Sequence, residues 1–367
     1  MNVHREVHFA VLTASDSELP EYGFEAPVYV NPTDYIDFKN GYTDTLNHRR
    51  SRWAEQFSRK SIARGRKLKR FCRKGIPPAS RPEVVFFQML NLFQIWMMVS
   101  GAKSRMEASP GLYLEALSKE PDKKIMSVIL ADLPRTFPEN VFFKNFTDPE
   151  SKLPSLKRVL VAFAAQFPKV GYCQGFNYIT AMLLLVLRGS PEANEERAFW
   201  LLDALINHLL PPYYSDDMVS VRRDCMVLGD LIKLRDPALN SIVVNSGVNY
   251  TTLCAKWFIC LYADVLPIET TMRIFDCLFY EGDKILFRAG FALIRLHRNH
   301  LLQCDEFPAL LTTFRSMCQD KQTLWCHEFL QATECAAPGR LMFQALRKYI
   351  TKIYMYRDIS NIMVTET

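Results

Sequence analysis

The twelve residues 156–167, LKRVLVAFAAQF, carry the pattern that decides the fold. Apolar side chains recur there at every third or fourth position, which is the spacing of one buried face of an α-helix. They stand at positions 156, 159, 160, 163, 164 and 167. The apolar–polar alternation typical of strands is scarce in the rest of the chain. The sequence therefore predicts an all-α fold.

The same helical period recurs further along the chain. It is found in residues 198–210, 226–234, 251–265, 272–278 and 285–296. Proline-bearing breaks separate these stretches at intervals typical of an all-α protein. No fixed repeat period links them, which disfavours a solenoid. Residues 1–48, which contain Pro20, Pro27 and Pro32, are expected to form an irregular leader before the helices.

Composition narrows the classes of function. The 367 residues are 49% hydrophobic and 23% charged, which is typical of a globular protein and excludes disorder of the whole chain. The sequence contains no phosphate-loop motif, so we expect no nucleotide site of the chain's own. No apolar stretch reaches the roughly 20 residues that span a bilayer, and the N-terminus lacks a secretory apolar region. We expect a cytoplasmic protein.

The ten cysteines form no C-x-x-C pair and no metal-binding quartet with histidine. We interpret them as free thiols in a reducing compartment, several of which pack as small apolar side chains. The sequence thus predicts neither a disulfide framework nor a metal site.

Positive charge is concentrated in residues 49–74. This segment holds twelve basic residues and one acid, a net charge of +11, whereas the whole chain carries +6, so the remainder sums to −5. The simpler interpretation is a solvated helix with Trp53, Phe57 and Ile62 on its inner side. The alternative is contact with phosphates, either of an anionic membrane or of nucleic acid. No zinc finger or RNA-binding signature accompanies the segment, so we expect no nucleic acid.

Two short segments could carry chemistry. The first, residues 129–138, reads ILADLPRTFP. Asp132 and Arg135 stand three positions apart, so on a helix or at its end the carboxylate can hold the guanidinium in one orientation. Taken alone, such a pair is most often a surface salt bridge worth less than about 1 kcal/mol. Thr136 and Phe137 are expected to fix the helix end.

The second segment, residues 170–177, reads VGYCQGFN. Gly171 and Gly175 bracket Tyr172 and Gln174, so the backbone can turn tightly and let a partner approach the glutamine. A carboxamide offers an acceptor and two donors, enough to orient a water molecule. Taken alone, the segment also fits a polar turn at the start of a helix.

Together, the two segments resemble the signature of the TBC-domain family of Rab GTPase-activating proteins. An I-x-x-D-x-x-R block is matched by Ile129, Asp132 and Arg135, and a Y-x-Q block by Tyr172 and Gln174, in the expected order. Further blocks that resemble the family are RKGIP at 73–77, FWLLD at 199–203, LPPYY at 210–214 and residues 257–276.

The resemblance implies a two-lobed, multi-helix TBC domain over residues 73–290. An N-terminal extension, 1–72, would precede it, irregular at first and then basic and helical. A C-terminal helical part, 291–367, would follow and pack on the domain.

The resemblance also implies the chemistry. Arg135 would be an arginine finger and Gln174 a glutamine finger, both inserted into the active site of a GTP-loaded Rab. Asp132 would orient Arg135, while Tyr172 and Gly175 would shape the loop that presents Gln174. Such a protein is a GTPase activator in vesicle trafficking rather than an enzyme by itself. It needs no cofactor of its own, because GTP and Mg²⁺ belong to the partner.

The chain departs from the family pattern in two places. Residues 85–95 are eleven more than the pattern contains before Trp96, about three helical turns at 3.6 residues per turn. A helix lengthened by that amount keeps Trp96 near its original phase. If the insertion misplaces the fingers, the alternative function is a non-catalytic Rab-binding scaffold. The second departure is Phe275, where the family commonly has tryptophan; another aromatic ring should pack there.

Overall fold

The computed structural model describes residues 22–27, 29–57, 65–78, 95–187, 189–215, 217–336 and 347–348. Within these ranges the regular structure is entirely helical and no β-strand occurs, so the predicted all-α fold class is confirmed. None of the helices in these ranges is both long and apolar enough to cross a bilayer.

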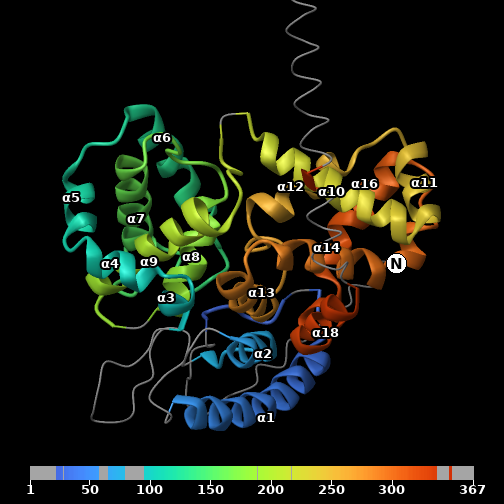
Figure 1. Ribbon diagram of the computed structural model, residues 1–367, viewed down its shortest axis with the longest axis horizontal. Helices are drawn as coiled ribbons and strands as arrows, with labels where there is room; N and C mark the ends of the chain where they lie inside the picture. Colours follow the sequence, from blue (N-terminus) through green and yellow to red (C-terminus); the bar gives the residue numbers. More distant parts are fainter. Residues whose placement is uncertain are drawn as a thin grey trace, which may run out of the picture.

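The helices form two groups on either side of a central helix, α13 (Ile268–Glu281) (Figure 1). The first group comprises α3 (Ile95–Val99), α4 (Ala102–Ala108), α5 (Leu112–Ser118), α6 (Lys123–Asp132), η2 (Leu133–Arg135), α7 (Leu153–Gln166), α8 (Phe176–Val186), α9 (Pro191–Asp203) and the π-helical turn η3 (Ala204–Leu209). The second comprises α10 (Val219–Arg235), α11 (Pro237–Asn245), α12 (Tyr250–Ile259), α14 (Lys284–Leu296), α15 (Arg298–Leu301), α16 (Phe307–Ser316), η4 (Met317–Gln319), α17 (Lys321–Leu324) and α18 (Cys326–Ala336). The N-terminal helices α1 (Pro32–Phe57) and α2 (Arg66–Lys74) lie at one end of the molecule, next to α13 and α18.

The helix predicted over residues 156–167 is α7, and its expected inner face is buried. Leu156, Val159, Leu160 and Phe163 are each at most 1% exposed. The stretches predicted at 198–210, 226–234, 272–278 and 285–296 also coincide with helices: α9 with η3, α10, α13 and α14 respectively. Helical periodicity therefore located most of the core.

The expected irregular leader over residues 1–48 is wrong for its second half. Helix α1 begins at Pro32, and the side chain of Asn31 accepts a hydrogen bond from the backbone N–H of Thr33 at 2.9 Å. An asparagine before the helix and a proline at its first position together form a favourable helix start. Pro32, which in the sequence suggests irregular structure, is therefore a helix initiator. Residues 1–21 lie outside the described residues.

The helix predicted over residues 251–265 is too long. Helix α12 ends at Ile259, and Leu261 and Tyr262 adopt left-handed backbone angles, with φ of +50° and +66°. Tyr262 is completely buried, and its hydroxyl donates to the backbone carbonyl of Leu286 at 2.8 Å. These residues are apolar and so continue the helical pattern, but they form a buried turn. Tertiary contacts offset the backbone strain of that turn.

The RKGIP block has a structural role at the junction between α2 and α13. The buried guanidinium of Arg273 donates to the carbonyl oxygens of Arg73 and Lys74, both at 2.6 Å. Gly75 has a φ of +109°, and a Cβ there would lie 1.6 Å from Nη1 of Arg273. Glycine is therefore required for steric as well as conformational reasons.

A second anchor in the same junction is the buried carboxylate of Asp276. It accepts hydrogen bonds from the backbone N–H of Ile76 at 3.0 Å and from Nε1 of Trp96 at 2.9 Å. The Trp96 ring packs 6.0 Å from the ring of Phe275, measured between centroids. Phe275 is itself fully buried, so an aromatic ring packs at this position, as the sequence predicted.

Two predictions reach beyond the described residues. Of the eleven additional residues 85–95, only Ile95 is described; it begins α3 and is 1% exposed. The lengthened helix predicted for the others stays a prediction. In the basic segment, Trp53 is buried as predicted, whereas Ile62 and the side chain of Phe57 lie outside the described part of the chain.

The terminal parts share one core with the rest. Tyr22 near the N-terminus and Leu301 and Phe314 in the C-terminal part belong to the same buried apolar cluster as the central helices. Further along, the guanidinium of Arg347 forms an ion pair with the fully buried carboxylate of Asp224. The described residues before 73 and after 290 therefore pack directly on the helices between them.

Candidate functional site

The site begins where α6 ends. Pro134 cannot donate the next helical hydrogen bond, so the chain tightens into the 3₁₀ turn η2, which carries Arg135. Asp132, the last residue of α6, is 1% exposed, whereas the side chain of Arg135 is 50% exposed. An ion pair joins Nη2 of Arg135 to Oδ1 of Asp132. The buried carboxylate of Asp132 thus holds the guanidinium of Arg135, which is still accessible to a partner.

The other carboxylate oxygen of Asp132 links the two sequence segments. The hydroxyl of Tyr172 donates to Oδ2 of Asp132 at 2.6 Å. Burial and the neighbouring carboxylate raise the pKa of Tyr172 far above its ordinary value, so the phenol remains protonated and keeps its donor role. The structure therefore brings Tyr172 beside the Asp132–Arg135 pair.

Gln174 lies on an exposed turn between the two glycines. Gly171 has a φ of +59° and Gly175 a φ of +108°. A Cβ on Gly175 would lie 3.1 Å from Cγ2 and 3.2 Å from the carbonyl oxygen of Ile259, so the turn packs closely on the end of α12. The carboxamide of Gln174 is exposed and makes no hydrogen bond to any residue that the structure describes. Its donors and acceptor are available for a ligand.

A second chain of hydrogen bonds connects the segments, and sequence reasoning missed its central residue, Asn177. The amide of Asn177 donates to the hydroxyl of Thr136 at 2.8 Å and accepts from the backbone N–H of Gly175 at 3.2 Å. Thr136 in turn donates to the carbonyl of Asp132 at 2.7 Å, which confirms that it fixes the helix end. The available signal was an asparagine in the apolar run 176–186, because a buried amide needs partners.

Aromatic side chains hold the backbone that follows Arg135. Phe137 has a left-handed φ of +47°, unusual for a residue with a large side chain. Its ring contacts those of Phe24 and Tyr178, with centroids 5.2 and 5.3 Å away. The hydroxyl of Tyr178 donates to the carbonyl oxygen of Arg135 at 3.2 Å. The loop that carries Arg135 is therefore restrained on both sides of that residue.

The chemistry available at this surface is that of a cation and an amide. The guanidinium of Arg135 can donate to anionic oxygens, and the carboxamide of Gln174 can orient a water molecule. No group of His, Cys, Asp and Glu with the geometry of a metal site occurs within the described ranges. The nine cysteines whose side chains the structure describes, all but Cys335, are free thiols, as predicted.

Comparison with known proteins identifies the family. The sequence profile of the Rab-GTPase-TBC domain matches residues 93–302, more than half of the chain, and this span contains both segments of the site. The chain belongs to the Rab-GTPase-TBC family. Its relatives include human growth hormone-regulated TBC protein 1, which is 38% identical over 89% of this chain and 92% of its own length. Growth hormone-regulated TBC protein 6 of Caenorhabditis elegans is 32% identical over 85% of both chains.

Solved TBC structures have the same architecture. The flagellar RabGAP TBC domain of Chlamydomonas superposes with a TM-score of 0.70 and is 28% identical; the match covers 85% of this chain and 97% of the other. The Ypt/Rab-GAP domain of Gyp1p superposes with a TM-score of 0.63 at 18% identity, over 79% of this chain and 98% of that domain, which supports the fold alone. The two-lobed TBC fold is thus confirmed.

Proposed function

We propose that this chain is a GTPase-activating protein for Rab-family small GTPases and that it supplies Arg135 and Gln174 in trans. Membership of the Rab-GTPase-TBC family supports the activating role. The observation that carries the finger assignment is the hydrogen bond from Tyr172 to Asp132. It links the loop of Gln174 to the carboxylate that forms the ion pair with Arg135. Both functional groups are exposed on segments that are held together.

The proposed mechanism follows from the chemistry of phosphoryl transfer. A small GTPase hydrolyses GTP slowly because charge on the γ-phosphoryl group is poorly neutralised in the transition state and the attacking water is poorly oriented. Arg135 would donate to the oxygens on which charge develops, and Gln174 would hold the water. An arginine finger accelerates the reaction by about 10³- to 10⁵-fold, which corresponds to roughly 4–7 kcal/mol of barrier.

The surrounding residues would position the fingers. Asp132 restrains Arg135 through one carboxylate oxygen and Tyr172 through the other, so docking would cost less side-chain entropy than it would for a free arginine. The chain would form no active site of its own and would hold no cofactor. GTP and Mg²⁺ would be bound by the Rab, whose active site the two fingers complete.

The test is GTP hydrolysis by a panel of GTP-loaded Rab proteins, with phosphate release and Rab binding measured on the same samples. Arg135→Lys should lose nearly all stimulation, because an ammonium group lacks the planar fork that spans two phosphate oxygens. Gln174→Ala should also lose stimulation and keep its helical content. The matched control is Arg315→Lys, since Arg315 is exposed on α16.

Three results would contradict the proposal. Full stimulation by Arg135→Lys would remove the arginine finger, and full stimulation by Gln174→Ala would leave Gln174 a turn residue. Binding of GTP-loaded Rab without faster phosphate release by the unaltered chain would instead identify a non-catalytic scaffold. Comparing the intact chain with one that lacks residues 85–95 would reveal whether the insertion causes that outcome.

We also propose a cytoplasmic location, at membranes through the Rab partner, and a role in vesicle trafficking. Contact of residues 49–74 with an anionic membrane stays a prediction. The positive charge of that segment is the reason to consider it.

A further inference from the structure

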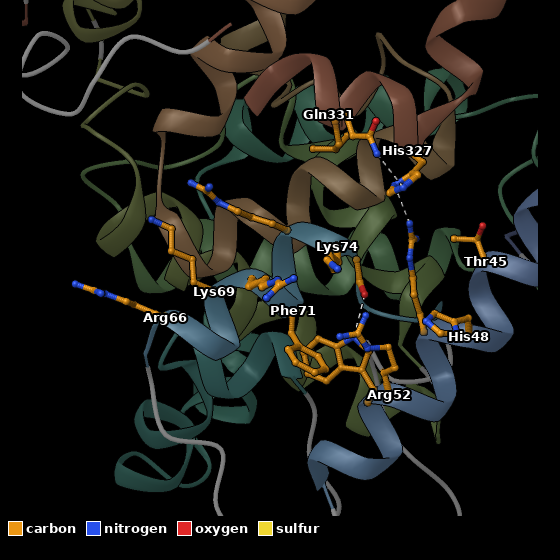
Figure 2. Close-up of a pocket in the computed structure, with 15 residues that line it drawn as sticks. Thr45, His48, Arg52, Arg66, Lys69, Phe71, Lys74, His327 and Gln331 are labelled. Atoms are coloured by element: carbon orange, nitrogen blue, oxygen red, sulfur yellow. Dashed lines mark hydrogen bonds between the residues drawn. The ribbon is translucent and has the colours of Figure 1, made fainter. Parts of the chain in front are cut away.

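A basic pocket lies where α1, α2 and α18 meet (Figure 2). Its volume is about 530 Å³, within the range of sites that hold small molecules. Trp53 and Phe71 form part of its apolar wall, and Leu330 contributes from α18. None of the described acidic residues lines it. The pocket is therefore both large enough for a ligand and of one charge sign.

Five of the cationic side chains that line the pocket have no carboxylate partner among the described residues. They are Arg49 and Arg52 from α1 and Arg66, Arg70 and Lys74 from α2. Burial and the charges of Arg70, Arg52 and Arg49 lower the pKa of Lys74, which shows that these groups repel one another. An anion in the pocket would relieve this repulsion.

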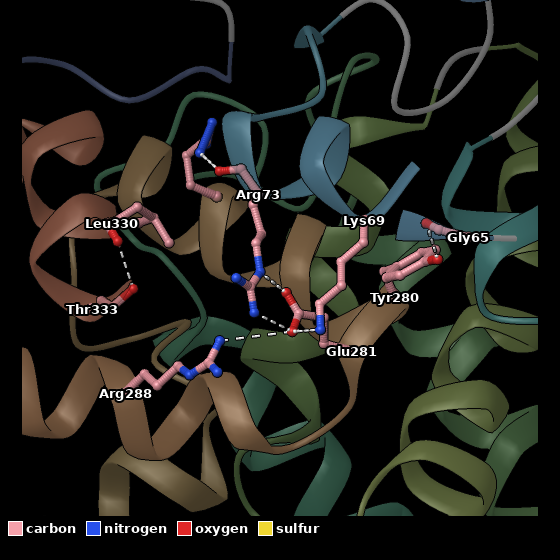
Figure 3. A network of polar contacts seen from close by, with 9 residues as sticks. Gly65, Lys69, Arg73, Tyr280, Glu281, Arg288, Leu330 and Thr333 are labelled. Atoms are coloured by element: carbon pink, nitrogen blue, oxygen red, sulfur yellow. Dashed lines mark hydrogen bonds and ion pairs between the residues drawn. The ribbon is translucent and has the colours of Figure 1, made fainter. Parts of the chain in front are cut away.

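A carboxylate at the end of the adjoining helix α13 is already neutralised. Glu281 accepts from Nη2 of Arg73 at 2.8 Å and forms an ion pair with Lys69 at 3.1 Å and a longer one with Arg288 at 3.7 Å (Figure 3). Burial opposes its charge, but the bonds to Arg73 and Lys69 outweigh burial and lower the pKa of Glu281. Lys69 and Arg73 are thereby compensated, and Glu281 has no charge to spare for the five unpaired cations.

The second, independent observation is a buried donor without a partner. Arg49 is 6% exposed, and its Nη2 lies 3.1 Å from Nδ1 of His327 on α18. Its Nη1 is buried and has no hydrogen-bond partner among the residues that the structure describes. Burial, followed by the charges of Arg49 and Arg273, lowers the pKa of His327, so the ring is neutral and its Nδ1 accepts a hydrogen bond from Nη2 of Arg49. A buried guanidinium donor beside a cavity calls for an acceptor that a ligand would supply.

We infer that this pocket binds a compact, multiply phosphorylated molecule, either a soluble phosphorylated polyol or the same group as the head of a lipid. Guanidinium groups bind phosphate through paired, charge-assisted hydrogen bonds. Five uncompensated cations exceed what one phosphate group can neutralise, so the ligand should carry at least two. The limited volume of the pocket favours a compact molecule over an extended polyanion.

The inference is independent of the proposed fingers. In Figure 1 the helices α1, α2 and α18 lie at the bottom of the view. Helix α6, which leads into Arg135, lies at the top of the group of helices on the left. Ligand binding and GTP hydrolysis can therefore be measured separately, and failure of one would not imply failure of the other.

The test compares two double variants of equal charge in the full chain. Arg70→Gln/Lys74→Gln removes two exposed cations that line the pocket, and Arg50→Gln/Lys67→Gln removes two exposed cations from the same helices outside it. The probe for the shared chemistry is inositol hexakisphosphate, measured by calorimetry and thermal shift. Vesicles with a bisphosphorylated phosphoinositide, vesicles of equal charge with phosphatidylserine, and a single-stranded oligonucleotide form the other arms.

We expect the pocket variant to lose about ten- to a hundredfold in affinity for the probe, as two charge-assisted hydrogen bonds are removed. The control variant should lose only about two- to threefold through long-range attraction. Preference for phosphoinositide over phosphatidylserine vesicles would identify the lipid as the source, and binding of the soluble probe alone would identify the free molecule. Equal losses in both variants, no binding of any probe, or tighter binding of the oligonucleotide than of the probe would overturn the proposal.

Discussion

Replacement of Tyr172 by phenylalanine tests the link between the segments that carry Arg135 and Gln174. The change removes one hydroxyl, the donor to Oδ2 of Asp132 at 2.6 Å, and leaves the ring in place. Asp132 is 1% exposed, so the lost donor leaves a buried carboxylate oxygen without that hydrogen bond. An unsatisfied buried acceptor costs about 1–3 kcal/mol, and we expect the free energy of unfolding to fall by that amount.

The same change should affect catalysis separately from binding. The loop of Gln174 would lose its tether to Asp132, and misplacement of a catalytic group by about 1 Å can cost roughly a hundredfold in rate. We expect single-turnover phosphate release at saturating activator to slow by about ten- to a hundredfold, with little change in Rab affinity. The loss should be smaller than that of Arg135→Lys, because Arg135 and Gln174 are both still present.

The matched control for Tyr172→Phe is Tyr35→Phe. The hydroxyl of Tyr35 makes no hydrogen bond to the described residues, so its removal should change the free energy of unfolding by less than about 0.5 kcal/mol. Chemical denaturation measures both variants. Equal stability of the two would refute the energetic argument for the Asp132 bond. A less stable Tyr172→Phe with unchanged phosphate release would refute the positioning role.

Two further substitutions test features of the site and of the pocket wall. Gly175→Ala should destabilise the protein by about 1–3 kcal/mol and slow phosphate release, because a φ of +108° and the contact with Ile259 both oppose a Cβ. The control is Gly111→Ala, at a φ of +79° with nothing within 4 Å of the added Cβ, which should cost only about 1 kcal/mol and leave phosphate release unchanged. Similar effects of the two substitutions would show that the contact with Ile259 is unimportant. Glu281→Gln should cost about 2 kcal/mol at neutral pH, because a carboxylate buried among cations is lost. Because the folded-state pKa of Glu281 is lowered, the stabilisation by its carboxylate is complete above the unfolded-state pKa near 4.5 and is lost as pH falls through the folded-state pKa. The difference in free energy of unfolding between Glu281→Gln and the parent should therefore shrink as pH falls below about 4.5. A difference that does not depend on pH would contradict the ion-pair assignment.

Helical periodicity predicted what depends on local spacing. The buried face of α7 is an example, because Leu156, Val159 and Phe163 face the core whatever their neighbours are. It failed where a tertiary contact overrode the local preference. Leu261 and Tyr262 continue the apolar pattern of α12, yet the hydrogen bond from Tyr262 to Leu286 holds them in a left-handed turn.

The candidate site was predictable as a list of residues but not as a network. The family motif names Asp132, Arg135 and Tyr172, whereas the bridge through Asn177 depends on which buried polar groups meet after folding. The basic pocket was predictable only in part. The charge of residues 49–74 is evident from the sequence. His327, however, is almost 280 positions away from Arg49, and no local pattern predicts their contact.

The hydrogen bonds from Arg273 to the carbonyls of residues 73 and 74 limit where the shortest fragment that folds by itself can begin. A fragment cut to the family match at residue 93 would strip a fully buried guanidinium of both its acceptors and would take the N–H of Ile76 from Asp276. A fragment that contains the TBC domain should therefore begin no later than Arg66, where α2 begins, for crystallography or assay. The stretch that matches the family profile and the unit that folds therefore have different borders.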